Sequence, residues 1–103
     1  MVTASFFRRG AEYTGFNISG HAGYDVAGQD IVCAAVSSMT MLTVNLVEGA
    51  FGVPSDLRVD EAKGDIYFHL KEEDPTASKI IKGFRDELTA LSEEYPQNIL
   101  VKE

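Results

Sequence analysis

Two stretches near the start of the chain alternate between hydrophobic and polar residues. Residues 2–8 alternate crudely and are rich in phenylalanine, and residues 13–19 alternate again after the glycine at position 10. Alternation with a period of two puts the apolar side chains on one face of a β-strand, and glycine favours the turn between paired strands. These stretches therefore predict a pair of antiparallel strands.

A long apolar stretch comes next, and it predicts a helix over about residues 31–51. Asp30 is a suitable N-cap, a Gly-Val-Pro sequence ends the stretch, and between Asp30 and Asp56 the only charged residue is Glu48. A helix that is apolar nearly all round needs burial on more than one side, so we expect a sheet against one face and a second subunit or a ligand groove against another. Its length approaches that of a membrane span, but the polar residues within it favour a helix buried in the protein core over one inserted into a membrane.

A second hairpin and a last strand lie in the other half of the chain. Residues 57–60 and 65–70 have the composition of strands, and Lys63-Gly64 lies at the turn between them. Residues 98–102 form a short apolar stretch near the end of the sequence, which predicts a final strand.

An amphipathic helix is expected between this hairpin and the final strand. Asp74 is the N-cap, Pro75 takes the first helical position, and Pro96 ends the segment. Apolar residues recur every three or four positions, with Lys, Asp and Glu mostly on the opposite side. The order is therefore ββαββαβ, and we predict an α+β fold of two layers, in which two helices pack on a mostly antiparallel sheet within a single domain of residues 1–103.

The composition is that of an ordinary globular domain. With 103 residues, 45% of them hydrophobic and 24% charged, the chain can bury a core without disulfides or metal ions. One cysteine cannot form an internal disulfide, and the first ten residues lack the basic segment and apolar run of a secretory signal. We therefore expect a cytoplasmic protein, because a reducing compartment suits a working thiol.

The charge balance limits the partners. The formal net charge is −7, and nine Lys and Arg residues scarcely supply the basic patch that phosphate binding needs, so direct binding to nucleic acid is not expected. An acidic surface favours basic partners such as a Lys/Arg-rich peptide, although mild acidity also simply keeps a protein soluble. No paired-cysteine or His-Glu metal spacing is present, so we expect neither a zinc site nor another cofactor.

The candidate chemistry centres on Cys33 and His21. Cys33 falls in the first turn of the expected helix, where unpaired N–H groups and the helix dipole favour a thiolate. His21 begins a glycine-bearing loop that could fold the imidazole over the helix start, where it could take the thiol proton. The first-turn amides, that of Cys33 included, could receive an oxyanion during acyl transfer. The alternatives are a buried small hydrophobe for Cys33 and a surface loop residue for His21.

Three further polar residues have candidate roles. Asp30 could orient His21, although its role as N-cap accounts for it without catalysis. Ser37 lies one turn after Cys33 on the same helical face, within reach of a thiolate or a substrate carbonyl, unless its hydroxyl bonds back to the helix backbone. His69 is expected to be a sheet residue rather than a catalyst.

The loop and the helix start together resemble a known signature. The matching residues are Gly20-His21-Ala22-Gly23-Tyr24, Gly28 and Asp30-Ile31-Val32-Cys33-Ala34-Ala35-Val36-Ser37. They closely resemble the signature of the bacterial ribosomal-processing cysteine protease Prp family. The resemblance implies a cysteine endopeptidase with His21 as general base, Cys33 as nucleophile, and Asp30 and Ser37 supporting the site. It also implies a homodimer, which would account for the apolar first helix.

The same resemblance implies the substrate. This is the short N-terminal extension of large-subunit ribosomal protein twenty-seven, which is removed after an aromatic residue. Substrate contacts are expected from a loop that contains Gly20, Gly23, Tyr24 and Gly28. The aromatic residue of the substrate needs an apolar pocket, which Phe6, Phe7, Tyr24 or Met41 could line.

Two other functions fit the same residues. A non-catalytic ribosome-associated protein-binding module would use the loop and the helix start to grip a protein tail. An acyl-thioester hydrolase would use the same two side chains on a different leaving group. The rate of Cys33 alkylation against pH separates an activated thiol from an incidental one, and profiling of peptides against small thioesters separates the two hydrolases.

Overall fold

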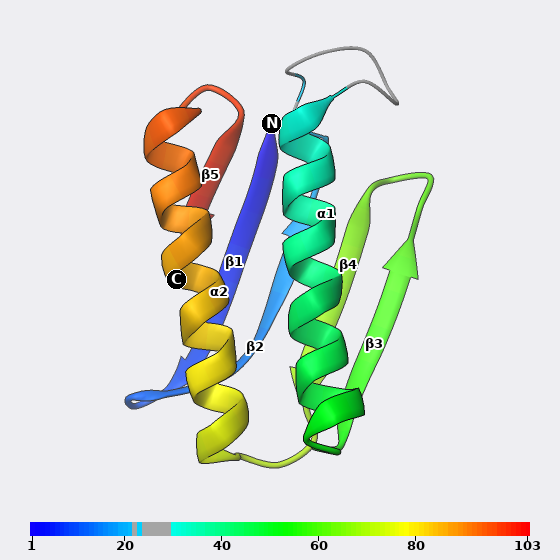
Figure 1. Ribbon diagram of the computed structural model, residues 1–103, viewed down its shortest axis with the longest axis vertical. Helices are drawn as coiled ribbons and strands as arrows, with labels where there is room; N and C mark the ends of the chain where they lie inside the picture. Colours follow the sequence, from blue (N-terminus) through cyan, green and yellow to red (C-terminus); the bar gives the residue numbers. More distant parts are fainter. Residues whose placement is uncertain (22, 24–29) are drawn as a thin grey trace.

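Five strands form one sheet, and two helices cover one of its faces (Figure 1). The computed structural model describes residues 1–21, 23 and 30–103. The strands are β1 (Val2–Arg9), β2 (Glu12–Ser19), β3 (Ser55–Asp60), β4 (Asp65–Leu70) and β5 (Ile99–Lys102). Their order across the sheet is β3-β4-β2-β1-β5, and every neighbouring pair is antiparallel except β1 and β5. The predicted two-layer α+β fold, with its order ββαββαβ, is confirmed.

The first helix consists of two segments with different geometry. α1 (Ile31–Val44) continues directly into the π-helical segment η1 (Asn45–Ala50), so the helical stretch ends one residue before the predicted Phe51. Asp30 begins the helix as predicted, because its Oδ1 accepts a hydrogen bond from the Cys33 N–H at 2.9 Å. This cap fixes the first turn, in which Cys33 lies.

Only one side of α1 is buried within the chain. The buried side chains are those of Val32, Val36, Thr40, Thr43 and Val44. On the outer side, Ile31 and Leu42 are 58% and 60% exposed, so the expected burial on a second side is not found within a single chain. By length and composition residues 31–50 could cross a membrane, but their buried side packs into the core of this domain.

The second helix, α2 (Pro75–Glu94), lies beside α1 on the same face of the sheet (Figure 1). Asp74 caps it as predicted, since its Oδ1 accepts a hydrogen bond from the Ala77 N–H at 2.8 Å. The ring of Phe84 meets those of Phe6 and Phe16 with centroids 5.6 and 5.0 Å apart, in the edge-on geometry that aromatic pairs prefer. The core therefore lies between the helices and one face of the sheet.

One end of the sheet gathers three separate parts of the chain. β2 ends there, α1 begins there, and the β3–β4 turn lies beside them (Figure 1). The antiparallel register pairs Ile18 with Ile66, so the chain that leaves β2 runs alongside the chain that enters β4. Residues that are far apart in sequence are thereby brought together at this end.

Candidate active site

A groove lies at this end of the sheet, between α1 and the β3–β4 hairpin. Its volume is about 330 Å³. Cys33 and Ser37 line it from α1, and His21 lines it from the chain that follows β2. The structure therefore places the predicted nucleophile, the predicted base and the predicted supporting serine around one cavity.

Cys33 reaches the groove from the capped first turn of α1. Its side chain is partly buried and packs against the core, and it also lines the groove. Its backbone N–H donates to Asp30 Oδ1 at 2.9 Å. The expectation that the Cys33 amide would receive an oxyanion is therefore wrong, because the Asp30 carboxylate accepts that N–H.

His21 is exposed at the rim of the groove, and the β3–β4 turn passes directly against its ring. A Cβ atom on Gly64 would lie 3.0 Å from the Cε1 atom and 3.2 Å from the Nε2 atom of the imidazole. On the side that faces the turn, the imidazole therefore packs against the backbone of Gly64, which has no side chain.

The predicted substrate-binding loop is described only in part. Gly20 lines the groove with a φ of +83°, a conformation that glycine adopts at little cost. Gly23 is exposed and is not among the groove-lining residues in the described part of the chain. Tyr24 and Gly28 lie outside the described residues.

The apolar wall of the groove differs from the predicted one. Of the proposed lining residues, Met41 does line the groove. Phe6 is buried in the core against Phe84, and Phe7 packs its ring 5.0 Å from that of His69, so neither reaches the groove. The apolar lining residues are Val2, Ile18, Val36, Met41, Val59 and Ile66.

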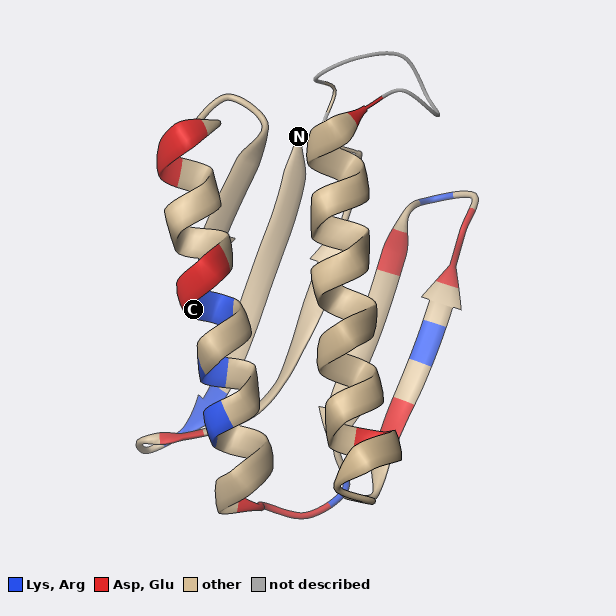
Figure 2. Ribbon diagram, viewed as in Figure 1, with Lys and Arg blue, Asp and Glu red and all other residues tan. Residues whose placement is uncertain are grey.

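The β3–β4 hairpin contributes groove residues that sequence reasoning missed. Asp60, Glu61 and Asp65 line the groove, and Figure 2 shows acidic residues on both sides of this turn. The Asp60 Oδ1 accepts a hydrogen bond from the Lys63 N–H at 3.2 Å, which helps to hold the turn. No local motif marks these residues, because only the pairing of β4 with β2 brings them to the site.

His69 lies away from the groove, as the sheet residue that was expected. Its Nε2 is 3.0 Å from Asn17 Oδ1, and its ring stacks on that of Tyr67 with centroids 4.2 Å apart. Burial lowers the pKa of His69 below its ordinary value. Among residues 1–21, 23 and 30–103, no group of His, Cys, Asp and Glu side chains is arranged to hold a metal ion.

Known proteins resemble this chain along almost its whole length. The sequence model of the family described as "Cysteine protease Prp" matches residues 1–100. The ribosomal processing cysteine protease Prp of Bacillus subtilis is 33% identical over 91 residues, which cover 84% of this chain and 81% of that protein. The protein of the same name from Staphylococcus aureus is 32% identical over 85 residues, which cover 80% and 78%.

A solved structure agrees with the sequence comparisons. The S. aureus protease Prp, in complex with a covalently linked product peptide, matches with a TM-score of 0.87 and 26% identity, and all of both chains is covered. The family match includes both His21 and Cys33, which line the groove described above. The chain therefore belongs to the Prp family of ribosomal-processing cysteine proteases and is a cysteine endopeptidase.

Proposed function

We propose that this protease removes the N-terminal extension of large-subunit ribosomal protein twenty-seven after an aromatic residue, with Cys33 as nucleophile and His21 as general base. The observation that carries the proposal is that both side chains line one groove at the start of a capped helix. The covalently linked product peptide in the S. aureus relative is consistent with a covalent step.

The reaction begins with a peptide bound in the groove. The proton of Cys33 passes to His21, and the thiolate sulfur forms a bond with the scissile carbonyl carbon. The carbon–nitrogen bond then breaks as His21 protonates the leaving amine, and a thioester remains on Cys33. His21 next deprotonates a water molecule, which attacks the thioester and releases the carboxylate product and the free thiol.

The start of α1 supplies donors for the oxyanion that forms in both steps. The first N–H groups of a helix have no acceptor within the helix, and they carry the positive end of its dipole. Because Asp30 accepts the Cys33 N–H, we assign the oxyanion to the amides of Ile31 and Val32. Asp30 supports the site by holding this turn, and Ser37 offers its hydroxyl to the substrate one turn later.

The walls of the groove suit a peptide with an aromatic residue and a basic segment. The apolar wall that includes Val36 and Met41 accommodates the aromatic side chain before the cut. Asp60, Glu61 and Asp65 on the opposite wall attract Lys and Arg side chains of the substrate.

We also propose that the protein forms a homodimer in the cytoplasm, where free thiols stay reduced. Ile31 and Leu42 are 58% and 60% exposed on the outer side of α1, and large apolar side chains exposed along one side of a helix favour burial against a second subunit. Leu42→Glu should convert a dimer to a monomer in sedimentation velocity. Leu100→Glu, at a β5 residue that is 45% exposed, is the control and should stay dimeric. A wild-type protein that sediments as a monomer at high concentration would contradict this part of the proposal.

Mass spectrometry of a peptide that carries the ribosomal extension tests the proposed chemistry. Cys33→Ala should lower the cleavage rate about a thousandfold or more, and His21→Ala about 10²–10⁴-fold, while circular dichroism shows an intact fold. Ser38→Ala is the matched control, because Ser38 is exposed beside Ser37 but does not line the groove. Cleavage by the Cys33 variant at the wild-type rate would overturn the assignment.

A further inference from the structure

The β3–β4 turn meets the catalytic groove through a glycine. Gly64 adopts a φ of +70°, and its N–H donates to the Glu61 carbonyl oxygen at 3.3 Å. A Cβ atom on Gly64 would lie 2.8 Å from the carbonyl oxygen of Gly20, as well as 3.0 and 3.2 Å from two ring atoms of His21. At 2.8 Å the backbone of Gly20 would have to move, so no side chain fits at this position without a local shift.

Both partners of this contact are held by other parts of the fold. The Lys63 N–H donates to Asp60 Oδ1 at 3.2 Å, which fixes the turn that carries Gly64. On the other side, Gly20 packs so closely on the Met1 carbonyl oxygen that it also has no room for a side chain. The register of β2 on β4 brings the two glycines together, and the contact is therefore a property of the sheet.

We propose that Gly64 is a positioning residue for the cleavage reaction. Because it has no side chain, the turn can lie against the His21 imidazole and hold this otherwise exposed ring at the rim of the groove that Cys33 lines. The proposal rests on the proposed function, in which His21 carries the protons. Fixing the ring matters because proton transfer requires the base within hydrogen-bond reach, and a displacement of about 1 Å can lower a rate about a hundredfold.

Gly64→Ala tests the contact by adding one methyl group to it. We expect kcat to fall about 10- to 100-fold while KM changes less than about threefold, because a misplaced base impairs proton transfer more than peptide binding. Alanine at a positive φ is also strained, so the unfolding temperature should fall by about 2–8 °C.

Gly10→Ala separates the strain from the contact. Gly10 lies between β1 and β2 with a φ of +62°, and a Cβ atom there would meet nothing within 4 Å. This variant should lose a similar amount of thermal stability, yet keep kcat within about twofold of the wild type. If Gly64→Ala fails to fold, Gly64→Asn and Gly10→Asn replace the pair, because asparagine tolerates positive φ better while keeping the Cβ atom.

A double-mutant cycle shows whether Gly64 acts through the imidazole. In a His21→Ala background, Gly64→Ala should lower the residual cleavage rate by a clearly smaller factor than in the wild-type background, because the shift of the Gly20 backbone remains but no ring is left to be misplaced. A loss by the same factor as in the wild-type background, or a Gly64 variant as active as its Gly10 counterpart, would overturn the positioning role. Either result leaves the proposed function intact, because that function fails only if Cys33→Ala or His21→Ala cleaves at the wild-type rate.

Discussion

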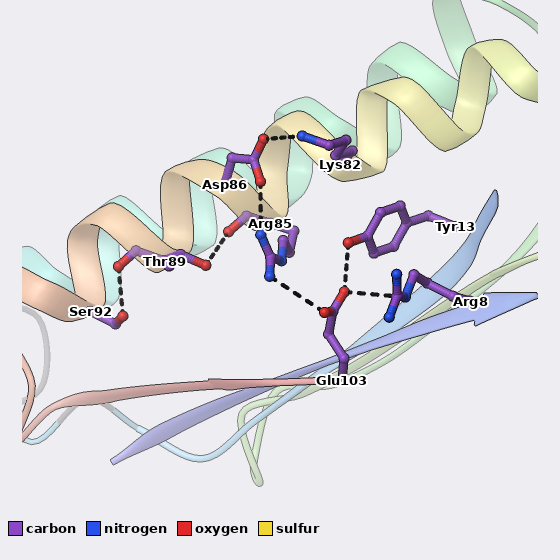
Figure 3. A network of polar contacts seen from close by, with 8 residues as sticks. All are labelled: Arg8, Tyr13, Lys82, Arg85, Asp86, Thr89, Ser92 and Glu103. Carbon is purple, nitrogen blue, oxygen red and sulfur yellow. Dashed lines mark hydrogen bonds and ion pairs between the residues drawn. The ribbon is translucent and has the colours of Figure 1, made fainter. Parts of the chain in front are cut away.

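Charged side chains near the two ends of β1 differ in whether they are paired within the chain. Near its C-terminal end, basic and acidic side chains form a paired network around Glu103 (Figure 3). Near its N-terminal end, three negatively charged side chains, those of Asp60, Glu61 and Asp65, line the groove. In the described part of the chain, none of these three carboxylates forms an ion pair.

The paired network is centred on the carboxylate of Glu103. The Tyr13 hydroxyl donates to Glu103 Oε1 at 2.5 Å, while Arg85 Nη2 and Arg8 Nε lie 3.4 and 3.6 Å from its oxygens. The Tyr13 hydrogen bond and, after it, the charges of the two arginines lower the pKa of Glu103. Burial, and after it the bond to Glu103, raises the pKa of Tyr13. These groups connect β1, β2, α2 and the residue after β5.

The two arrangements have different physical consequences for the protein. A carboxylate with a hydrogen-bond donor and two cations has its charge balanced within the chain. The carboxylates beside the groove repel one another and have no cation paired with them among the residues that the structure describes, so a cation or a basic peptide from outside would stabilise them. We therefore expect that removing a charge from the network lowers stability, whereas removing the charges of Glu61 and Asp65 weakens the binding of a basic substrate.

The double substitution Glu61→Gln and Asp65→Asn tests whether the groove carboxylates attract a basic substrate. Removing two charges should raise KM for a substrate with a Lys-rich tail about 3- to 10-fold at low salt, and the effect should shrink as salt screens the charges. Asp60 is left unchanged because its side chain holds the turn. Steady-state kinetics at two salt concentrations measure the effect.

Glu93→Gln with Glu94→Gln is the matched control for this pair. It removes the same net charge from exposed residues near the end of α2, away from the groove, and should leave KM unchanged. A substrate whose tail lysines are replaced by glutamine should respond to neither pair. Equal KM values for the groove pair and the wild type on the lysine-rich substrate would refute the proposed role of these carboxylates.

Tyr13→Phe tests whether the network around Glu103 stabilises the fold. Loss of the hydroxyl that donates to Glu103 should lower the free energy of unfolding by about 1 kcal/mol and leave kcat/KM unchanged. Chemical denaturation measures the first quantity. Tyr67→Phe is the control, because the Tyr67 hydroxyl has no hydrogen bond within the described residues, and its stability should be that of the wild type.

The pH dependence of the Tyr13→Phe effect follows from the two pKa shifts. The folded-state pKa of Glu103 is lowered, so its stabilisation is present above the unfolded value of about 4.3 and is lost as the pH falls through the folded value. The folded-state pKa of Tyr13 is raised, so its contribution is present below about pH 10 and is lost as the pH rises further. The difference between variant and wild type should therefore be greatest between these limits, and a difference that stays constant into acid would contradict the role of Glu103.

Local signals in the sequence predict most of the elements of this fold. Asp30 and Asp74 both cap helices as expected, because a carboxylate just before a helix accepts its unpaired first-turn N–H groups. The π-helical end of the first helix and the parallel pairing of β1 with β5 were not predicted. The pairing of β1 with β5 joins opposite ends of the chain, which leaves no pattern in a short stretch of sequence.

The sequence predicts only those residues of the candidate site whose local sequence context marks them. Cys33 is marked by its place in a helix start and His21 by the glycines around it. The adjacent residues Phe6 and Phe7 point to opposite faces of the sheet, and alternation alone does not show which face the helices cover. Gly64 reaches the imidazole only through strand pairing, so no sequence motif reveals its role.

Intact-mass analysis of an acid-quenched single turnover tests whether Cys33 is the nucleophile. Wild-type protein is mixed with the peptide that carries the ribosomal extension, stopped at successive times, and digested to map any adduct. We predict that the N-terminal cleavage fragment appears as a thioester on Cys33 before it is released, and that His21→Ala slows its formation. An adduct mapped to any residue other than Cys33 would show that Cys33 is not the nucleophile.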